Sequence, residues 1–503
     1  MFPATMLVRP HSEDVRIIGF YLGRVLFLAS LAGTIPIVVS VVSGELGLTG
    51  GFLLMIGIGA TLFGLAEWIR PGPNARLRWS EGMVVVALAW ILVPVLSAIP
   101  FFLSGRYVGF LSAIFEAMSG FATIGLTVVN DLDHMSSALL VWRQTTHFIG
   151  GQGIVLVALS VFAGGGALAL YHGEARDERI LPSVTSTARF IWLVSALYGL
   201  VGISALTLLL DLRLGFEPGR ALLHAYSLFV AAFDTGGFAA MSTSVAFYHS
   251  PAIEVLLTWL MLSGSLSFGV HFILLRTPRN FFRNLETKTY LTTIFATSLV
   301  GMTGLVLLGL ATEPITLLRR GLFHLISAHT TTGFSNITTS DLASWSGLAF
   351  AAIATAMALG GMASSTSGGV KALRVGLTIR TLGQSIRRTL LPEHTVLSNT
   401  FYQNGRRTLT SDLAQSVLVV SLLYVGLYLF GTVVGIAHGY PLQASLFEAT
   451  SAASGTGLSV GITAPDMPWL LQVVYVLLMW VGRLEFISVF VLIGFAASTV
   501  VGE

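Results

Sequence analysis

The 503-residue chain contains no cysteine and very little charge. Only 10% of its residues are Asp, Glu, Lys or Arg, whereas 54% are apolar, and the mean hydropathy is +0.82. The absence of cysteine excludes disulfides and thiolate metal sites. The scarcity of charge excludes a soluble protein, because a soluble surface of this size needs far more charged side chains. The composition therefore predicts an all-α protein that crosses a membrane many times.

Motifs of enzymes and nucleotide-binding proteins are missing as well. The chain has no HExxH, no GxxxxGK[ST] and no paired carboxylates within its apolar runs. Five of the eleven histidines are scattered through the apolar part of the sequence, and we expect them to make polar packing contacts: His147, His224, His271, His324 and His329. We therefore expect no enzymatic activity and no cofactor in this chain.

Ten apolar runs are long enough to span a bilayer. They cover residues 17–42, 51–69, 82–104, 138–170, 189–211, 251–275, 288–311, 346–369, 412–437 and 468–496. The polar start, Met1 to Arg16, lacks the pattern of a cleavable signal peptide, so the first run is expected to remain as an anchor.

Four short segments between these runs end alike in a glycine turn. They are Thr123-Ile124-Gly125, Thr235-Gly236-Gly237, Thr331-Thr332-Gly333 and Gly455-Thr456-Gly457, each followed by Leu or Phe. The first and last copies also share a Phe-Glu-Ala sequence at the same distance before the glycine, Phe115 to Ala117 and Phe447 to Ala449. A single copy would be read as a buried helix with a C-capping glycine. Four copies between membrane hairpins predict a repeat of span, half-helix, turn and span.

We accordingly expect four repeats in a pseudo-fourfold arrangement around one pore. Residues 82–180 form the first, 181–285 the second, 286–408 the third, with a broken second span and a cytoplasmic loop, and 409–503 the fourth. Residues 1–81 add an N-terminal segment and an extra hairpin. Glycine lets a non-helical strand expose backbone carbonyls, which can replace the water around a cation, so the four turns are the candidate selectivity filter. Glu116 and Glu448 are expected to act at helix N-termini rather than to bind ions.

The chain resembles the pore subunits of the Trk/Ktr/HKT superfamily of potassium transporters, and its TrkH type most, over nearly its full length. The resemblance rests on the turns and on three further motifs: Trp142-Arg143-Gln144 with His147 to Val155, Gly360 to Lys371, and Gly482-Arg483-Leu484-Glu485. It implies potassium uptake through a channel-like pore with K⁺ at the turn residues. A sodium-permeable or cation-coupled secondary transporter of the same fold is the alternative. Gly125, where sodium transporters of the superfamily carry serine, implies potassium.

Two features are candidates for a gate. The first is the glycine-rich segment Gly360, Gly361, Ala363, Ser364, Ser365, Thr366, Ser367, Gly368 and Gly369. On residues alone it is either a loop or a helix-packing face of small residues, and the resemblance favours a loop across the pore. The second is Arg483, either one member of a structural ion pair or, as the resemblance implies, a barrier in the cavity below the filter. Asp234, beside the second turn, faces either the ion path or outward.

Arginine and lysine concentrate on one side of the predicted spans, most densely between Lys371 and Arg407. The positive-inside rule then places both termini in the cytoplasm and the glycine turns toward the outside of a bacterial or archaeal plasma or inner membrane. The resemblance implies a homodimer that works with a cytosolic nucleotide-binding ring protein of the TrkA kind. The alternative is that the basic loops only set topology and contact anionic lipid. We expect no nucleic-acid partner.

Overall fold

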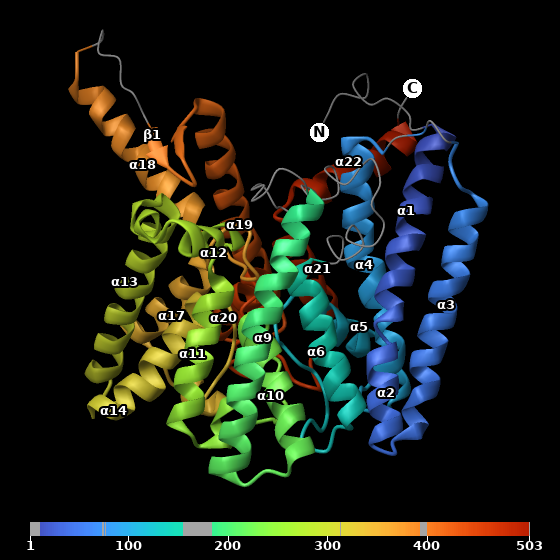
Figure 1. The fold of residues 1–503 in the computed structure, drawn as a ribbon. Coiled ribbons are helices and arrows are strands. Elements are labelled where there is room, and N and C mark those ends of the chain that lie inside the picture. Colours follow the sequence, from blue (N-terminus) through green and yellow to red (C-terminus); the bar gives the residue numbers. More distant parts are fainter. Residues whose placement is uncertain are drawn as a thin grey trace.

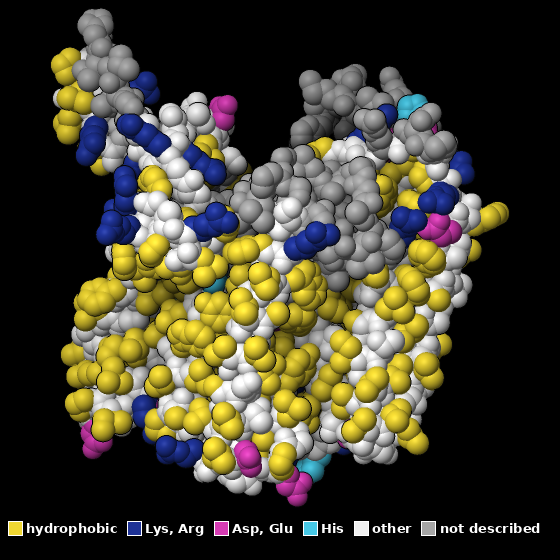
Figure 2. All heavy atoms as spheres, in the orientation of Figure 1, with side chains coloured by type: hydrophobic (Ala, Val, Ile, Leu, Met, Phe, Trp, Pro, Cys, Tyr) yellow, Lys and Arg dark blue, Asp and Glu magenta, His cyan; other side chains and the backbone are white. Residues whose placement is uncertain are grey.

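The structure is a computed structural model that describes residues 11–72, 75, 77–153, 184–311, 313–392 and 400–501. Most of the described chain is helical, and the helices stand side by side as a bundle (Figure 1). The side chains on the flank of the bundle are mostly hydrophobic, and basic side chains gather along the upper margin of this apolar band (Figure 2). This is the surface that a lipid bilayer requires.

The N-terminal hairpin lies at one edge of the bundle. Helices α1 (Ser12–Leu31) and α2 (Thr34–Val42) form one long span, and α3 (Thr49–Trp68) returns beside it after the short helix η2 (Leu46–Leu48). Arg24 of α1 and Glu67 of α3 form an ion pair with an N–O distance of 2.6 Å. The hairpin packs against α4 and stands outside the four units that follow (Figure 1).

Each of the four units contains a long first helix, a short second helix and a third helix that returns. The first helices are α4 (Trp79–Leu103), α9 (Val184–Leu214), α13 (Leu285–Leu307) and α19 (Ser411–Ala437). The short helices are α5 (Phe110–Phe121), α10 (Pro218–Phe233), α15 (Phe323–His329) and α20 (Leu442–Ser454), with the turn α14 (Pro314–Thr316) and the π-helix η5 (Leu317–Leu322) leading into α15. The returning helices begin with α6 (Ser137–Gln152), α11 (Pro251–Ser265), α17 (Gly347–Leu359) and α21 (Trp469–Leu484), and the linking segments contain η3 (Ser244–Tyr248) and α16 (Thr339–Ala343).

The returning helices are interrupted more often than the sequence indicates. Helix α12 (Phe268–Arg276) is bent by 100° from α11, and α22 (Ile487–Val501) by 110° from α21. In the third unit, α17 is followed by a non-helical loop and then by α18 (Ala372–Leu390). The sequence predicts a break only in this third unit. Six of the ten expected spans are long, apolar helices in the described residues, and the bent pairs account for two more. Most of the second half of the expected span 138–170 lies outside the described residues.

One face of the bundle carries the only strands in the described part of the chain. Strands β1 (Thr400–Tyr402) and β2 (Arg406–Thr408) form an antiparallel hairpin in which Phe401 is opposite Arg407. The β-hairpin, called the hairpin from here on, lies on this face together with α18 and the beginning of α1 (Figure 1). We call it the N-terminal face. The 3₁₀ helix η4 (Pro278–Arg283) leads from α12 into α13 beside the hairpin.

Candidate functional site

All four short helices end with the same backbone geometry. In the first three, the residue after the C-cap has a positive φ: 53° at Thr123, 49° at Thr235 and 55° at Thr331. In the fourth, the C-cap itself, Gly455, has a φ of 79°. The next amide then donates back to a carbonyl five residues earlier, as in Ile124 to Ser119 at 2.9 Å and Thr456 to Ser451 at 2.9 Å. This is the hydrogen bond of a Schellman cap. A positive φ is costly for a β-branched threonine, so three of the four turns hold a strained backbone at the same position.

The four glycines two residues further on form a closed ring. Each has a positive φ, from 74° at Gly237 to 91° at Gly125. A Cβ atom on any of them would collide with the carbonyl oxygen of the residue that precedes the glycine of the next unit. The pairs are Gly125 with Gly236, Gly237 with Thr332, Gly333 with Thr456, and Gly457 with Ile124. The order therefore runs once around the ring and returns to its start, and only glycine fits at each position.

Side chains of the short helices hold the strands that leave the ring. Glu116 accepts hydrogen bonds from the Thr127 hydroxyl at 2.9 Å and the Val128 amide at 3.2 Å. Glu448 likewise accepts from the Val460 amide at 2.9 Å and from the Ser459 hydroxyl at 2.5 Å. Both glutamates lie in the middle of their helices, so the expectation that they act at helix N-termini is wrong. Both are fully buried and brace the backbone beyond the turns.

His324 takes the place of the glutamate in the third unit. Its Nε2 lies 2.9 Å from the Ser335 hydroxyl and 3.3 Å from the Asn336 amide nitrogen, at the same sequence offsets as the contacts of Glu116 and Glu448. From the sequence alone, this histidine is expected to make only packing contacts. Its position nine residues before Gly333, which matches Glu116 before Gly125, is the signal that reveals the equivalence.

The second unit has a leucine at this position, and its strand is held by side chains of the first unit. Arg143 of α6 donates to the Ala239 carbonyl at 3.0 Å, Gln144 donates to the Phe238 carbonyl at 2.8 Å, and the Phe238 amide donates to His147 Nε2 at 3.2 Å. The Arg143 guanidinium also lies over the Phe238 ring, 3.9 Å from its centroid. The first unit therefore positions the strand of the second. The Arg143 side chain is buried within the bundle.

Removing the Arg143 charge should cost about 3–5 kcal/mol of stability, because its partner Glu116 would remain buried and unpaired. The two side chains form an ion pair at 2.8 Å and are 1% and 0% exposed. We expect Arg143→Met to lower the thermal denaturation temperature of the purified protein markedly. Arg106→Met, which breaks the more exposed pair with Asp131, is the control and should cost at most about 1 kcal/mol. Equal shifts for the two variants would contradict the bracing role.

Acidic residues on the face opposite the N-terminal face are engaged locally. Asp131 pairs with Arg106 at 3.0 Å, and a hydrogen bond from His134 lowers the pKa of its carboxyl. Asp133 accepts from the Ser242 amide at 2.7 Å and from its hydroxyl at 2.6 Å. The contacts of Asp133 tie the linking segments of the first two units together, whereas the Asp131 pair lies within the first unit.

The glycine-rich segment between α17 and α18 is a compact loop. Gly360 and Gly369 have φ values of 70° and 78°, and Ser364 one of 54°. The loop is closed at its base, where the Val370 amide donates to the Ala358 carbonyl at 3.0 Å and Lys371 to Leu359 at 2.9 Å. Met362 also donates to the Ser265 carbonyl at 3.1 Å, so the loop is docked at the break between α11 and α12.

The tip of the loop lies against the first residue of three glycine turns. The Thr366 hydroxyl is 3.1 Å from the Thr235 hydroxyl, and the Thr366 carbonyl accepts from the Thr123 hydroxyl at 3.5 Å. The Gly368 amide donates to the Thr331 hydroxyl at 2.8 Å. In the fourth unit, a Cβ atom on Gly368 would collide with the Ser454 carbonyl oxygen. The loop therefore touches all four units on the N-terminal side of the ring.

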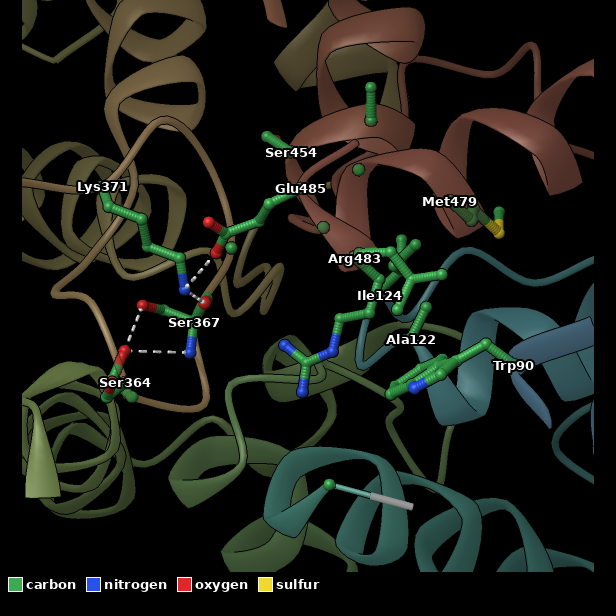
Figure 3. Close-up of a pocket in the computed structure, with 17 residues that line it drawn as sticks. Trp90, Ala122, Ile124, Ser364, Ser367, Lys371, Ser454, Met479, Arg483 and Glu485 are labelled. Atoms are coloured by element: carbon green, nitrogen blue, oxygen red, sulfur yellow. Dashed lines mark hydrogen bonds and ion pairs between the residues drawn. The ribbon is translucent and has the colours of Figure 1, made fainter. Parts of the chain in front are cut away.

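Arg483 holds the same loop from the fourth unit. It lies near the end of α21 and donates to the Thr366 carbonyl at 3.1 Å and to the Gly150 carbonyl at 2.7 Å. Its guanidinium points into a cavity lined by Ile124, Ser367 and Trp90, together with other residues of the loop and of α21 (Figure 3). The positive charge of the Arg483 side chain thus lies between the loop and the first and fourth turns.

Charged groups also fix both ends of the loop. Lys371 donates to the Ser367 carbonyl at 2.5 Å and lies 3.9 Å from Glu485 (Figure 3), which also pairs with Arg374. Glu485 sits at the bend between α21 and α22 with a φ of 52°. At the other end, the buried Glu286 accepts from the Ala363 amide at 2.5 Å and from the Gln403 side chain at 2.9 Å. The loop is therefore connected to the hairpin on the N-terminal face.

Asp234 caps α10 directly before the second turn. Its side chain is buried, and Oδ1 accepts from Gln152 of α6 at 3.0 Å. A Cβ atom on Gly151 would lie 2.8 Å from this carboxylate, so the side chain is directed at the end of α6. Oδ2 has no hydrogen-bond partner among the described residues. Neither of the two orientations expected from the sequence describes this inward position between helices.

The structure brings all of the sequence-predicted site residues into one region. The twelve turn residues form the ring and its immediate surroundings. The glycine-rich segment lies on the N-terminal side of the ring, and Arg483 contacts that segment. Within the described ranges, no cluster of three or more His, Asp or Glu side chains has the geometry of a metal site. Ile154 and Val155 of the motif after His147 lie outside the described residues.

Comparison with known proteins gives a consistent result. The family model of TrkH, a cation transport protein, matches residues 55–497. An uncharacterized cation transporter of Methanocaldococcus jannaschii is 30% identical, with 97% of each chain covered. The Trk system potassium uptake protein TrkH of Halomonas elongata is 28% identical over 95% of this chain and 98% of its own. The crystal structure of the potassium transporter TrkH from Vibrio parahaemolyticus has the same fold, with a TM-score of 0.80, 22% identity, and 95% and 98% coverage. The chain is therefore a multi-pass membrane protein of the TrkH family, a family of cation transporters and not of enzymes.

Proposed function

We propose that the protein takes up potassium through a pore along the axis of the glycine ring. The closed ring of Gly125, Gly237, Gly333 and Gly457 is the observation that carries the proposal. Because each glycine abuts a carbonyl of the next unit, four backbone strands approach one axis at a width set by the backbone itself. Such carbonyls can replace the hydration shell of K⁺. The names of the relatives from Halomonas elongata and Vibrio parahaemolyticus support potassium as the ion.

The filter in this proposal consists of the four glycine turns. Its residues are Thr123, Ile124, Gly125, Thr235, Gly236, Gly237, Thr331, Thr332, Gly333, Gly455, Thr456 and Gly457. The short helices end at these turns, so the negative ends of their dipoles point toward the cation. The four units correspond to residues 82–180, 181–285, 286–408 and 409–503, which form one path in a single chain.

The loop from Gly360 to Gly369 acts as the gate, and Arg483 keeps it closed. The contacts of Thr366 and Gly368 with the turn threonines leave the loop directly below the filter. Arg483 adds a positive charge there, and two charges about 4 Å apart interact by about 4 kcal/mol at an effective dielectric constant of 20. Opening then requires the loop to leave these contacts and Arg483 to move away from the path.

The N-terminal face is cytoplasmic in this proposal. Its margin is rich in basic side chains (Figure 2), as the positive-inside rule requires of the cytoplasmic side. Both termini would then be cytoplasmic, in a bacterial or archaeal plasma or inner membrane. Helix α18 and the hairpin provide a docking surface for a TrkA-like regulatory ring protein that binds the nucleotide, and the pore subunit functions as a homodimer.

Deletion of residues 363–367 tests the gate. It removes the tip of the loop but keeps the hydrogen bonds of Val370 and Lys371 that close its base. We expect potassium flux into liposomes, measured per folded protein and without a regulator, to rise severalfold. Thr366→Ser, which keeps the hydroxyl, is the matched control and should behave like the wild type. Unchanged or lower flux in well-folded deletion protein would contradict the gate.

A further inference from the structure

A basic cavity opens on the N-terminal face beside the hairpin. It lies between η4 and the start of α13, the middle of α18, and strands β1 and β2. Four of its lining residues are cationic: Arg283, Lys288, Arg380 and Arg406. No acidic side chain of the described residues lines it. The cavity is separate from the ring and the loop, and the ion path does not use it.

The four cations have no carboxylate partner among the described residues. The guanidinium of Arg380 donates to the Thr400 carbonyl at 2.7 Å, and that of Arg283 stacks on the Tyr402 ring at 5.2 Å from the centroid. These contacts orient the side chains without neutralising them. Gathering four like charges is unfavourable unless an anion balances them. The geometry thus favours a ligand that carries a phosphate or a similar group.

The position of the cavity relative to the bilayer selects the kind of ligand. Lys288 is in the first turn of α13, a helix long and apolar enough to span the membrane. On the same face of this helix follow Leu291, Phe295 and Leu299, with 41%, 69% and 56% of their surfaces exposed. An anion bound at Lys288 is therefore at the level of lipid headgroups, with an apolar surface for acyl chains directly below it.

We propose that this cavity binds the headgroup of an anionic phospholipid. The phosphate lies among Arg283, Lys288 and Arg406, and one acyl chain follows the exposed side chains of α13. The lipid would bridge α13, α18 and the hairpin. This is the hairpin whose Gln403 contacts Glu286, so the lipid would stabilise the support of the loop.

Lipid retention measures the binding directly. The purified full-length protein is mixed with phosphatidylcholine and phosphatidylglycerol, and bound lipid is counted by native mass spectrometry. We expect retained phosphatidylglycerol in the wild type and a loss in the double variant Lys288→Gln/Arg406→Gln. Each basic residue near the membrane surface contributes about a fivefold change in affinity, so the pair should weaken binding roughly thirtyfold. Arg387→Gln/Arg388→Gln removes the same charge from α18 outside the cavity and should retain the lipid.

Two results would overturn the proposal. One is equal retention of phosphatidylglycerol by the wild type and the Lys288/Arg406 variant. The other is displacement of the bound lipid by millimolar inorganic phosphate, which would identify a soluble phosphate as the ligand. Both substituted side chains are exposed, so the variants should fold. The measurement does not depend on ion movement and is therefore independent of the proposed potassium uptake.

Discussion

Replacing Gly125 with serine is expected to lower the potassium-to-sodium permeability ratio about tenfold, a change of about 1.4 kcal/mol in relative ion binding. The new Cβ atom would collide with the Gly236 carbonyl oxygen, and Gly125 has a φ of 91° that a serine adopts only with strain. The ring must therefore widen or tilt at this position. Because Gly457 abuts Ile124 in the same way, the disturbance reaches the units on both sides.

Gly109→Ser is the matched control for this substitution. Gly109 is in the same unit, at the N-cap of α5, and a Cβ atom there meets nothing within 4 Å. Serine is also a favourable residue at this cap. Permeability ratios are measured on reconstituted protein from ion gradients of known composition. If Gly125→Ser folds and leaves the ratio unchanged, Gly125 does not belong to the filter.

Arg483→Gln is expected to increase potassium flux at least tenfold in the absence of a regulator. The substitution removes a positive charge from the path, and a tenfold gain needs only about 1.4 kcal/mol of the roughly 4 kcal/mol estimated for two charges about 4 Å apart. It also weakens the contacts with the Thr366 and Gly150 carbonyls that hold the loop. The ion preference should be nearly unchanged because Arg483 does not contribute to the ring. Flux per folded protein in liposomes is the measurement.

Arg483→Lys separates the two effects of this residue. Lysine keeps the charge but cannot reproduce the planar pair of donors that reaches both carbonyls. If the charge is the main barrier, the lysine variant will conduct as little as the wild type. If the hydrogen bonds to the loop dominate, its flux will rise toward that of Arg483→Gln. A fall in flux for well-folded Arg483→Gln would exclude both roles.

The parts of the fold that depend on local pattern could be predicted from the sequence. The long apolar runs are visible as such, and the turns recur because every unit needs a glycine where the next strand approaches. The loop was ambiguous on its residues alone, since small residues favour helix packing as well as turns. What decides it is the docking of Met362 at Ser265, a contact between residues far apart in the chain.

The features that the sequence does not reveal depend on contacts between units. The bend after α11 occurs where the loop of the third unit inserts. The neighbouring sequence indicates it only weakly, through Ser267, which caps α12 by accepting from the Val270 amide at 3.2 Å. The role of Arg143 depends on the strand of the second unit, which has no brace of its own. The equivalence of His324 and Glu116 is hidden because different side chains provide the same hydrogen bonds.

The unequal bracing of the ring gives the four quarters of the proposed pore three kinds of support. A tetramer of identical subunits must change all four walls whenever one codon changes. In this chain a buried carboxylate supports two of the walls and an imidazole supports the third. The guanidinium and the side-chain amide of a neighbouring unit support the fourth. A substitution at one brace, such as His324, acts directly on the strand of its own unit alone, so the walls of the proposed pore need not all change together.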